Sequence, residues 1–321
     1  MTTTRRAAIG AAASLLAAPP LLGLSGAAAQ GAAPPATGPA FHRFDVGALK
    51  VVVVTDGTNV RADATQGLVV NATAEQVGGA MRAAGIAGPA MRNPFNVTFV
   101  ETPRGLVAID VGTGGFPNTD TGVLHANMRA AGLDPARVVQ VVHTHFHGDH
   151  IGGLTGADGA AVFPSAAVAV PEREWAYWTD AGEASRAPEA RRPAFANVQR
   201  RFAPYLQRVT RFAPDAEVVP GIRAVASNGH SPGHTSFLIH DGNRQALVIG
   251  DAITTPIFFM ANPEWYPVFD MDPTMAVESR KRLLDRAATE RMPVIGYHFD
   301  MPATGRVERA GTGYRLVPAG A

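Results

Sequence analysis

Metal-binding side chains are concentrated in one short stretch of this sequence, which begins at Thr144 and reads THFHGDHIGG. It holds an HxHxDH pattern, with His145 and His147 two residues apart and Asp149 and His150 close behind. In an extended segment, residues two apart point the same way, so both imidazoles of the first pair can reach one cation. The second pair falls at the expected start of a helix, where it can face another cation about 3.5–4 Å away. Imidazole combined with carboxylate is a donor set typical of zinc.

Three later stretches carry residues of the same types. A loop rich in glycine and proline reads NGHSPGHT and contains His230 and His234. Two apolar runs of strand type read ALVIGD and VIGYH, and they end at Asp251 and His298. A carboxylate or imidazole at the carboxyl end of a buried strand is a common way to build a site on an α/β scaffold. A histidine-rich surface loop without a function is therefore a poor explanation of the central motif.

The segments that must position these residues are expected to alternate between strands and helices. Apolar, β-branched runs predict strands at Leu49–Val54, Asn96–Val100 and Leu106–Ile109 and in the run VVQVV before the motif. Helical patterns are predicted at Ala74–Ala84 and Val277–Ala288, and a turn at residues 56–58. Two halves that each supply ligands fit a four-layer αβ/βα sandwich in the α/β class.

Two features lie between the predicted strand at Leu106–Ile109 and the motif. Asp110 follows that strand directly, and we expect it to orient a metal-binding histidine from behind, with a turn-capping role as the alternative. The run Gly112–Gly115 reads GTGG. It lacks the spacing and the lysine of a phosphate-binding loop, so it predicts a tight turn beside the site.

The motifs THFHGDHIGG, GHSPGHT, GDA and GYH occur in the order found in the metallo-β-lactamase-fold hydrolases, which this sequence resembles. It is similar in particular to the branch that contains methyl parathion hydrolases and lactonases. The resemblance covers nearly the whole chain from Val51 to Val317. It implies the αβ/βα sandwich and metal binding, and it is much less specific for the substrate.

The resemblance implies seven metal-binding residues divided between two divalent ions. The first ion would be bound by His145, His147 and His234, the second by Asp149, His150 and His298, and Asp251 would bridge the two. The neighbouring His230 is expected to support the ligands rather than to bind. Zinc is the expected metal, with manganese, cobalt or iron as alternatives. His143 has no assigned role, and structural roles are expected for His42, His125 and His240.

The implied chemistry is hydrolysis. A water shared by two cations would be acidified from 15.7 toward about 7, so that a bridging hydroxide forms at neutral pH and attacks a carbonyl carbon or phosphorus. Asp149 would orient this hydroxide and Asp251 would hold both ions. A serine nucleophile is not required, and no GxSxG nucleophile elbow between a strand and a helix is evident. We expect neutral esters as substrates, above all lactones or aryl esters, with phosphotriesters as a side activity.

Aromatic residues are expected to form the substrate pocket. By resemblance, Phe116 and Trp178 fall near the entrance, and Phe258 is a further candidate wall. Less specific candidates for the same wall are Phe195, Phe259 and Trp265. One aromatic residue that the parathion-hydrolase branch carries falls on Ala194 here, which argues against efficient organophosphate turnover.

Three alternatives remain open. A thioesterase of the glyoxalase II type would need cationic side chains for glutathione, and lysine occurs only at positions 50 and 281. A β-lactamase is the second alternative. The third is a non-catalytic periplasmic module that binds metal, which degenerate ligand positions would favour, whereas all seven positions are filled.

The composition excludes several other classes of function. The sequence contains no cysteine, which excludes disulfide scaffolds, cysteine nucleophiles and cysteine metal ligands. The formal net charge is +1, and no cluster of basic residues in the sequence indicates nucleic-acid binding. A small-molecule substrate is therefore the expected partner. A hydrophobic content of 46% supports a substantial core. The family resemblance implies a homodimer.

The amino-terminal segment has the features of an export signal. Two arginines at positions 5 and 6 precede the apolar run Ala7–Leu24 and the small residues Ala27–Ala29. We therefore expect a twin-arginine signal peptide at residues 1–29, removed on export to the periplasm or medium, with no stable membrane insertion of the mature chain. Residues 30–40 are expected to be a flexible linker, and residues 41–321 a single hydrolase domain.

Overall fold

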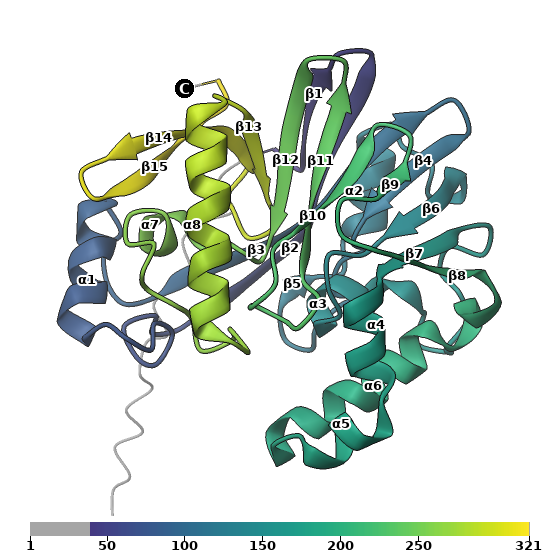
Figure 1. Ribbon diagram of the computed structural model, residues 1–321, viewed down its shortest axis with the longest axis horizontal. Helices are drawn as coiled ribbons and strands as arrows, with labels where there is room; N and C mark the ends of the chain where they lie inside the picture. Colours follow the sequence, from purple (N-terminus) through teal and green to yellow (C-terminus); the bar gives the residue numbers. More distant parts are fainter. Residues whose placement is uncertain (1–38, 321) are drawn as a thin grey trace, which may run out of the picture. The chain divides into compact units, whose positions relative to one another are not determined.

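Two β-sheets form the centre of the protein, shown in Figure 1 as a computed structural model that describes residues 39–320. The predicted signal peptide and most of the predicted linker lie outside the described residues. All described residues belong to one unit, residues 33–321. The prediction of a single domain for residues 41–321 stays a prediction.

The first sheet comes from the amino-terminal half and has the strand order β1-β2-β3-β4-β6-β7-β8, with β5 paired to β2. Its strands are β1 (Phe41–Val46), β2 (Leu49–Arg61), β3 (Met91–Thr102), β4 (Gly105–Ile109), β5 (Asp120–Thr121), β6 (Val138–Val142), β7 (Ala167–Pro171) and β8 (Val209–Phe212). The second sheet has the order β15-β14-β13-β12-β11-β10-β9. Its strands are β9 (Glu217–Val219), β10 (Ile222–Ala226), β11 (Thr235–Asp241), β12 (Arg244–Gly250), β13 (Pro293–Gly296), β14 (Thr304–Ala310) and β15 (Gly313–Pro318).

Helices cover the outer faces of the sheets. They are α1 (Ala74–Ala83), α2 (Leu124–Ala130), α3 (Gly148–Ile151), α4 (Glu172–Thr179), α5 (Ala181–Arg186), α6 (Arg192–Phe202), α7 (Pro256–Phe259) and α8 (Pro273–Thr289). Short 3-10 turns are η1 (Pro135–Arg137), η2 (Gly152–Leu154), η3 (Glu189–Arg191) and η4 (Ala203–Arg208). In Figure 1, α8 lies beside α7 and the last strands, and α4 to α6 lie below β7 and β8.

Alternation along β2 shows how the layers pack. Val51 and Val53 share a buried cluster with Phe237 of the second sheet. Val52 and Val54 point the other way and share a cluster with residues of α2 and α6. One face of the first sheet therefore packs on the second sheet and its other face packs on helices, which confirms the predicted αβ/βα sandwich.

Two predictions of secondary structure, one of a turn and one of the start of a helix, differ from the structure. The predicted turn at residues 56–58 is wrong, because β2 continues through it with an irregularity in register between Thr55 and Gly57. Asp56 is buried there and accepts hydrogen bonds from the backbone N–H groups of Thr113 and Leu124. The helix predicted from Val277 begins four residues earlier, after the capping residue Asp272 and with proline at its first position.

Parallel strand pairs bring the candidate site together. Strands β4 and β6 are parallel in the first sheet, and strands β12 and β13 are parallel in the second. The central motif follows β6, and Asp110 follows β4. Asp251 follows β12 directly, and His298 lies two residues beyond β13. Since carboxyl ends of parallel strands share one edge of a sheet, residues far apart in sequence can meet there. Within residues 39–320, no helix has both the length and the apolar character needed to span a bilayer.

Candidate metal centre

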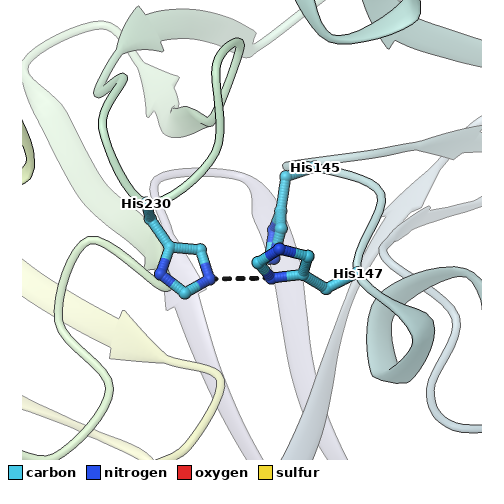
Figure 2. Close-up of side chains that lie close together, drawn as sticks. All are labelled: His145, His147 and His230. Carbon is cyan, nitrogen blue, oxygen red and sulfur yellow. Dashed lines mark hydrogen bonds between the residues drawn. The ribbon is translucent and has the colours of Figure 1, made fainter. Parts of the chain in front are cut away.

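Three histidines converge in the first of two groups of potential ligands. They are His145, His147 and His230, and their ligand nitrogens lie within 4.8 Å of one another. Figure 2 shows the first two on one loop and the third on a facing loop. His230 Nε2 lies 2.9 Å from His147 Nδ1. Two ring nitrogens that face each other at this distance can bind one cation between them.

The second group contains two carboxylates and two histidines, namely Asp149, His150, Asp251 and His298, again with ligand atoms within 4.8 Å. Asp251 lies between the groups. Its Oδ2 is 3.2 Å from His298 Nε2 and 3.3 Å from His230 Nε2, and its Oδ1 is 3.2 Å from His150 Nε2. This position fits the predicted bridging role.

The two histidines in the NGHSPGHT loop make different contacts. His234 was assigned as a ligand, but both of its ring nitrogens are engaged: Nε2 accepts from the backbone N–H of Asp251 at 2.9 Å, and Nδ1 lies 2.8 Å from Ser227 Oγ. His230 reaches the other two histidines of the first group instead. The assignment of His234 as a ligand and of His230 as a support stays a prediction.

Neighbouring oxygens orient the histidines that can bind. Asp110 Oδ2 lies 2.8 Å from His150 Nδ1, which confirms the contact expected for Asp110. His298 Nδ1 lies 2.9 Å from the Pro94 carbonyl oxygen, and His230 Nδ1 lies 2.9 Å from Asp270 Oδ1. When Nδ1 donates to an oxygen, the lone pair of Nε2 is left to face the ligand group.

The side chains present fit divalent cations. The buried side-chain atoms without a hydrogen-bond partner in the described part of the chain include three atoms of the two ligand groups: His145 Nε2, His150 Nε2 and Asp251 Oδ1. Leaving such an atom unpaired costs about 1–3 kcal/mol, and more if it is charged, so their clustering at one place requires a compensating ligand. A cation is the ligand that imidazole nitrogens and carboxylate oxygens share.

Burial and neighbouring charges shift the pKa values of the histidines at the site and of Asp251. Burial lowers the pKa of His145 and His147 well below the usual range, which keeps both rings neutral and able to bind a cation. Burial acts the same way on His230, but the contacts with Asp251 and Asp270 outweigh it and raise its pKa to about 9. Burial would raise the pKa of Asp251, but the charges of His298 and His150 lower it well below the usual range. Asp251 is therefore an anion.

Glu174 is a buried residue that the sequence did not single out. Its Oε1 accepts from the backbone N–H of Phe146 and from Trp178 Nε1, and its Oε2 accepts from Ser231 Oγ and the Gly233 N–H. One carboxylate thus joins the two loops that carry the first ligand group. The loops approach α4 closely, since a Cβ at Gly233 would lie 2.2 Å from the Glu174 nitrogen. The local signal was a glutamate four residues before a tryptophan on one helix.

The other histidines lie apart from the ligand groups. His42 stacks on Phe44, His125 packs on Phe163, and His240 contacts Glu217. These contacts agree with the structural roles expected for them. His143 is fully buried behind the site, with its Nδ1 3.5 Å from Asp110 Oδ1 and its ring against Phe146 and Phe202.

A cavity of about 700 Å³ opens onto the two ligand groups. Its floor includes His147, Asp149, His230, Asp251 and His298. Apolar walls come from Leu68, Met91, Phe95, Phe116, Trp178, Val268, Phe269 and Met271, and polar ones from Asn59, Arg61, Asn93, Arg191, Thr254 and Thr255. The aromatic entrance residues Phe116 and Trp178 are thus found where they were expected, and Ala194 also lines the cavity.

The prediction that Phe258 forms a pocket wall is wrong. Its ring is fully buried in the core cluster beside Phe259 and does not line the cavity. Phe195, Phe259 and Trp265 are likewise absent from the lining among the described residues. Their apolar character serves packing, which a sequence pattern cannot separate from pocket lining.

Comparisons with known proteins place these observations in a family context. The family model described as "Metallo-beta-lactamase superfamily" matches residues 92–298, which is more than half of the chain. The N-acyl homoserine lactonase AiiA of Bacillus thuringiensis subsp. kurstaki is 27% identical over 175 residues, or 54% of this chain and 60% of that protein. The chain thus spans about three-fifths of the length of this lactonase.

Two further proteins are similar over longer stretches. The acyl-coenzyme A thioesterase MBLAC2 of Gallus gallus is 28% identical over 234 residues, which is 69% of this chain and 78% of that protein. The solved structure of AidC, described as a dizinc quorum-quenching lactonase, matches with a TM-score of 0.80 at 22% identity. The match covers 88% of this chain and 98% of that one. This structural similarity shows a common fold.

Proposed function

Because the chain belongs to the metallo-beta-lactamase superfamily, we propose that it is a metal-dependent hydrolase that holds two divalent ions and cleaves neutral esters. The substrates are lactones above all, followed by aryl esters. Zinc is the proposed ion, in line with the imidazole and carboxylate donors of the two groups.

One observation carries the proposal: two ligand groups meet at Asp251 on the floor of a cavity of about 700 Å³. Two divalent ions bound at such a floor acidify water and polarise a carbonyl oxygen. The protein groups around them have separate tasks. Asp149, whose side chain is 20% exposed, faces the cavity and orients the attacking water by accepting one of its protons in a hydrogen bond.

The walls of the cavity support an uncharged substrate with an apolar portion. Phe116 and Trp178 provide aromatic surface, and Val268 and Phe269 are about half exposed at 53% and 52%. Lactones with an acyl substituent match this surface, and the AiiA relative is named for such a lactone. Phosphotriester hydrolysis is proposed only as a side activity, because Ala194 lines the cavity where the parathion-hydrolase branch would supply a ring.

Thioester hydrolysis is the second candidate. The thioesterase MBLAC2 is similar over 69% of this chain, and Arg61 and Arg191 both line the cavity. Two guanidinium groups there suit an anionic leaving portion such as a phosphorylated thiol carrier.

The experiment is an assay of the purified mature protein loaded with zinc, manganese or cobalt. The substrate panel contains γ- and δ-lactones with short and long acyl chains, aryl esters, a paraoxon-type triester, an acyl-coenzyme A and nitrocefin. The proposal expects the highest kcat/KM on a lactone or aryl ester. Turnover of nitrocefin alone would reject it, and a preference for the acyl-coenzyme A would select the second candidate.

We also propose export and dimerisation, which rest on the arginine pair with its apolar run and on the family resemblance respectively. Fractionation of cells that express the full chain should recover a shortened protein outside the cytoplasm. Light scattering of the mature protein should give twice the mass of the chain. A full-length cytoplasmic protein or a monomer would contradict the respective proposal.

A further inference from the structure

We propose that Glu174 of α4 is a positioning residue that holds the aromatic wall of the cavity, represented by Trp178, against the loops at its floor. The two loops are the central motif after β6 and the NGHSPGHT loop between β10 and β11. This role presupposes the substrates of the proposed function, and it holds whichever histidines of the two loops bind the ions.

Four hydrogen bonds surround the carboxylate of Glu174, whose side chain is fully buried. Its Oε1 accepts from Trp178 Nε1 at 2.7 Å and from the Phe146 N–H at 3.1 Å. Its Oε2 accepts from the Gly233 N–H at 2.7 Å and from Ser231 Oγ at 2.8 Å. One oxygen therefore contacts the wall and the central motif, and the other contacts the NGHSPGHT loop.

The donors lie directly beside candidate ligands. Phe146 stands between His145 and His147, and Gly233 immediately precedes His234. The NGHSPGHT loop also packs closely on the helix, because a Cβ at position 233 would lie 2.2 Å from the backbone nitrogen of the glutamate. A displacement of the carboxylate would therefore reach both loops through their backbones.

The same carboxylate selects the direction of an indole in the cavity wall. Glu174 and Trp178 are four residues apart on α4, so their side chains share one face of the helix. The indole is 1% exposed and lines the cavity. Its ring centroid lies 4.8 Å from that of Phe195 and 6.2 Å from that of His147. Packing alone permits either side of the indole to face the floor, whereas the hydrogen bond to Oε1 permits one.

Packing alone is a weaker explanation of a carboxylate at this place. Within residues 39–320, Glu174 forms no ion pair, and the four groups that donate to it are neutral. A buried carboxylate without a cation loses its hydration at a high cost in free energy, and an apolar side chain of similar size would avoid that cost. What an apolar side chain cannot supply is an acceptor for groups on three separate segments.

The test separates the two oxygens by substitution. Glu174→Gln keeps the size of the side chain, and its amide oxygen should remain at the Oε1 position, where both partners can only donate. Its NH2 group then faces the Gly233 N–H, so the contact with the NGHSPGHT loop is lost. Trp178→Phe removes the indole contact and leaves the carboxylate in place.

Each variant has a matched control. Asp56→Asn alters another buried carboxylate, which is 1% exposed and accepts from two backbone N–H groups. Trp175→Phe alters an indole on the same helix that packs on Phe146 and Phe202 and is not among the described residues that line the cavity. The measurements are kcat and KM on the best substrate of the panel, affinity for two zinc equivalents by competition with a chromogenic chelator, and thermal unfolding.

We expect Glu174→Gln to lower both kcat and the affinity for zinc by about 10-fold, the low end for residues behind metal ligands, because it acts through the backbone beside them. Its KM should stay near that of the wild type. Trp178→Phe should raise KM for lactones with long acyl chains and leave kcat and zinc affinity unchanged. Both controls should change only the unfolding temperature. The proposal is overturned if Glu174→Gln also changes only the unfolding temperature.

A second variant keeps the test decisive if Glu174→Gln does not fold. Ser231→Ala removes one donor to Oε2 and leaves the carboxylate intact. It should lower kcat and zinc affinity by less than Glu174→Gln and leave KM unchanged. Values of kcat and zinc affinity equal to those of the wild type would overturn the proposal.

The last readout needs neither substrate nor metal. The sequence contains three tryptophans, so protein with ¹⁵N-labelled tryptophan should give three indole N–H signals, and Trp178→Phe identifies the one from Trp178. This signal should keep its position in Glu174→Gln and move in Glu174→Ala, and an unmoved signal in Glu174→Ala would overturn the contact. A wild-type protein that binds zinc but cleaves no substrate of the panel overturns the proposed function alone, whereas one that binds no zinc overturns both proposals.

Discussion

The two ligand groups differ in charge and in how they are held. The first group contains three imidazoles, and the second contains two imidazoles and two carboxylates. Attraction for a cation grows with the negative charge of its ligands, so the second group has the stronger intrinsic hold. The first group depends more on alignment, because neutral rings bind well only when their lone pairs converge. The negative charge nearest to the first group is that of Asp251, whose Oδ2 lies 3.3 Å from His230 Nε2.

The source of alignment also differs. His150 and His298 are oriented by Asp110 and by the Pro94 carbonyl, both in the first sheet or at its edge. His230 is oriented from the residues before α8, on the other side of the site. The first group is thus assembled from the two halves of the chain, and its geometry depends on how those halves pack. This difference predicts which changes remove two ions, one ion or none.

The largest effect is expected for Asp251→Ala. It removes the carboxylate that both groups share, so the protein should lose both ions and with them its hydrolytic activity. Metal analysis after gel filtration, together with the lactone assay, measures the two losses. Retained binding of two equivalents would show that Asp251 does not connect the groups.

An intermediate effect separates His230 from His234. His230→Ala removes a nitrogen of the first group and should leave one tightly bound equivalent and one weak one. His234→Ala removes contacts with Ser227 and the Asp251 backbone, which should cost about 1–3 kcal/mol of stability while both equivalents are retained. Metal titration and chemical denaturation of both variants check this. The opposite pattern, with an ion lost only in His234→Ala, would support the assignment of His234 that the family resemblance implies.

The smallest effect concerns the metal-free protein. Asp251 and Asp270 raise the pKa of His230 from its ordinary 6.5 to about 9, and Asp251 also raises that of His298. The protonated His230 ring stabilises the fold fully below pH 6.5, and this stabilisation is lost as the pH rises through about 9. The unfolding temperature of chelator-treated protein should fall over that range. The zinc-loaded protein should show a smaller change, and an equal fall in both would contradict the pKa assignment.

The accuracy of the sequence-based predictions depended on local regularity. The motif after β6 was interpreted correctly because alternation in an extended segment fixes where His145 and His147 point. The division of roles between His230 and His234 stays a prediction, because both lie in a glycine-rich loop, where spacing does not determine direction. In that loop Gly229 has φ +125°, and contacts with α4 and α8 decide which ring faces the site.

Other parts of the site depend on contacts between residues that are far apart in the sequence. Asp270 meets His230 across 40 residues of sequence, and Glu174 meets Gly233 across 59. Their importance comes from packing between loops and helices, which composition and periodicity do not encode. The prediction for Phe258 failed for a related reason. An aromatic side chain is equally suited to a pocket wall and to the core, and Phe258 packs into the core.

The rim of the cavity and its floor come from different parts of the architecture. The floor follows strand ends, whereas Trp178, Ala194 and Phe269 belong to α4, α6 and the segment before α8. Substrate selectivity can therefore change during evolution, or be redesigned, without a change in the residues on the cavity floor. Ala194 is the natural starting point for such engineering: a bulkier side chain there would narrow the opening and favour slimmer molecules.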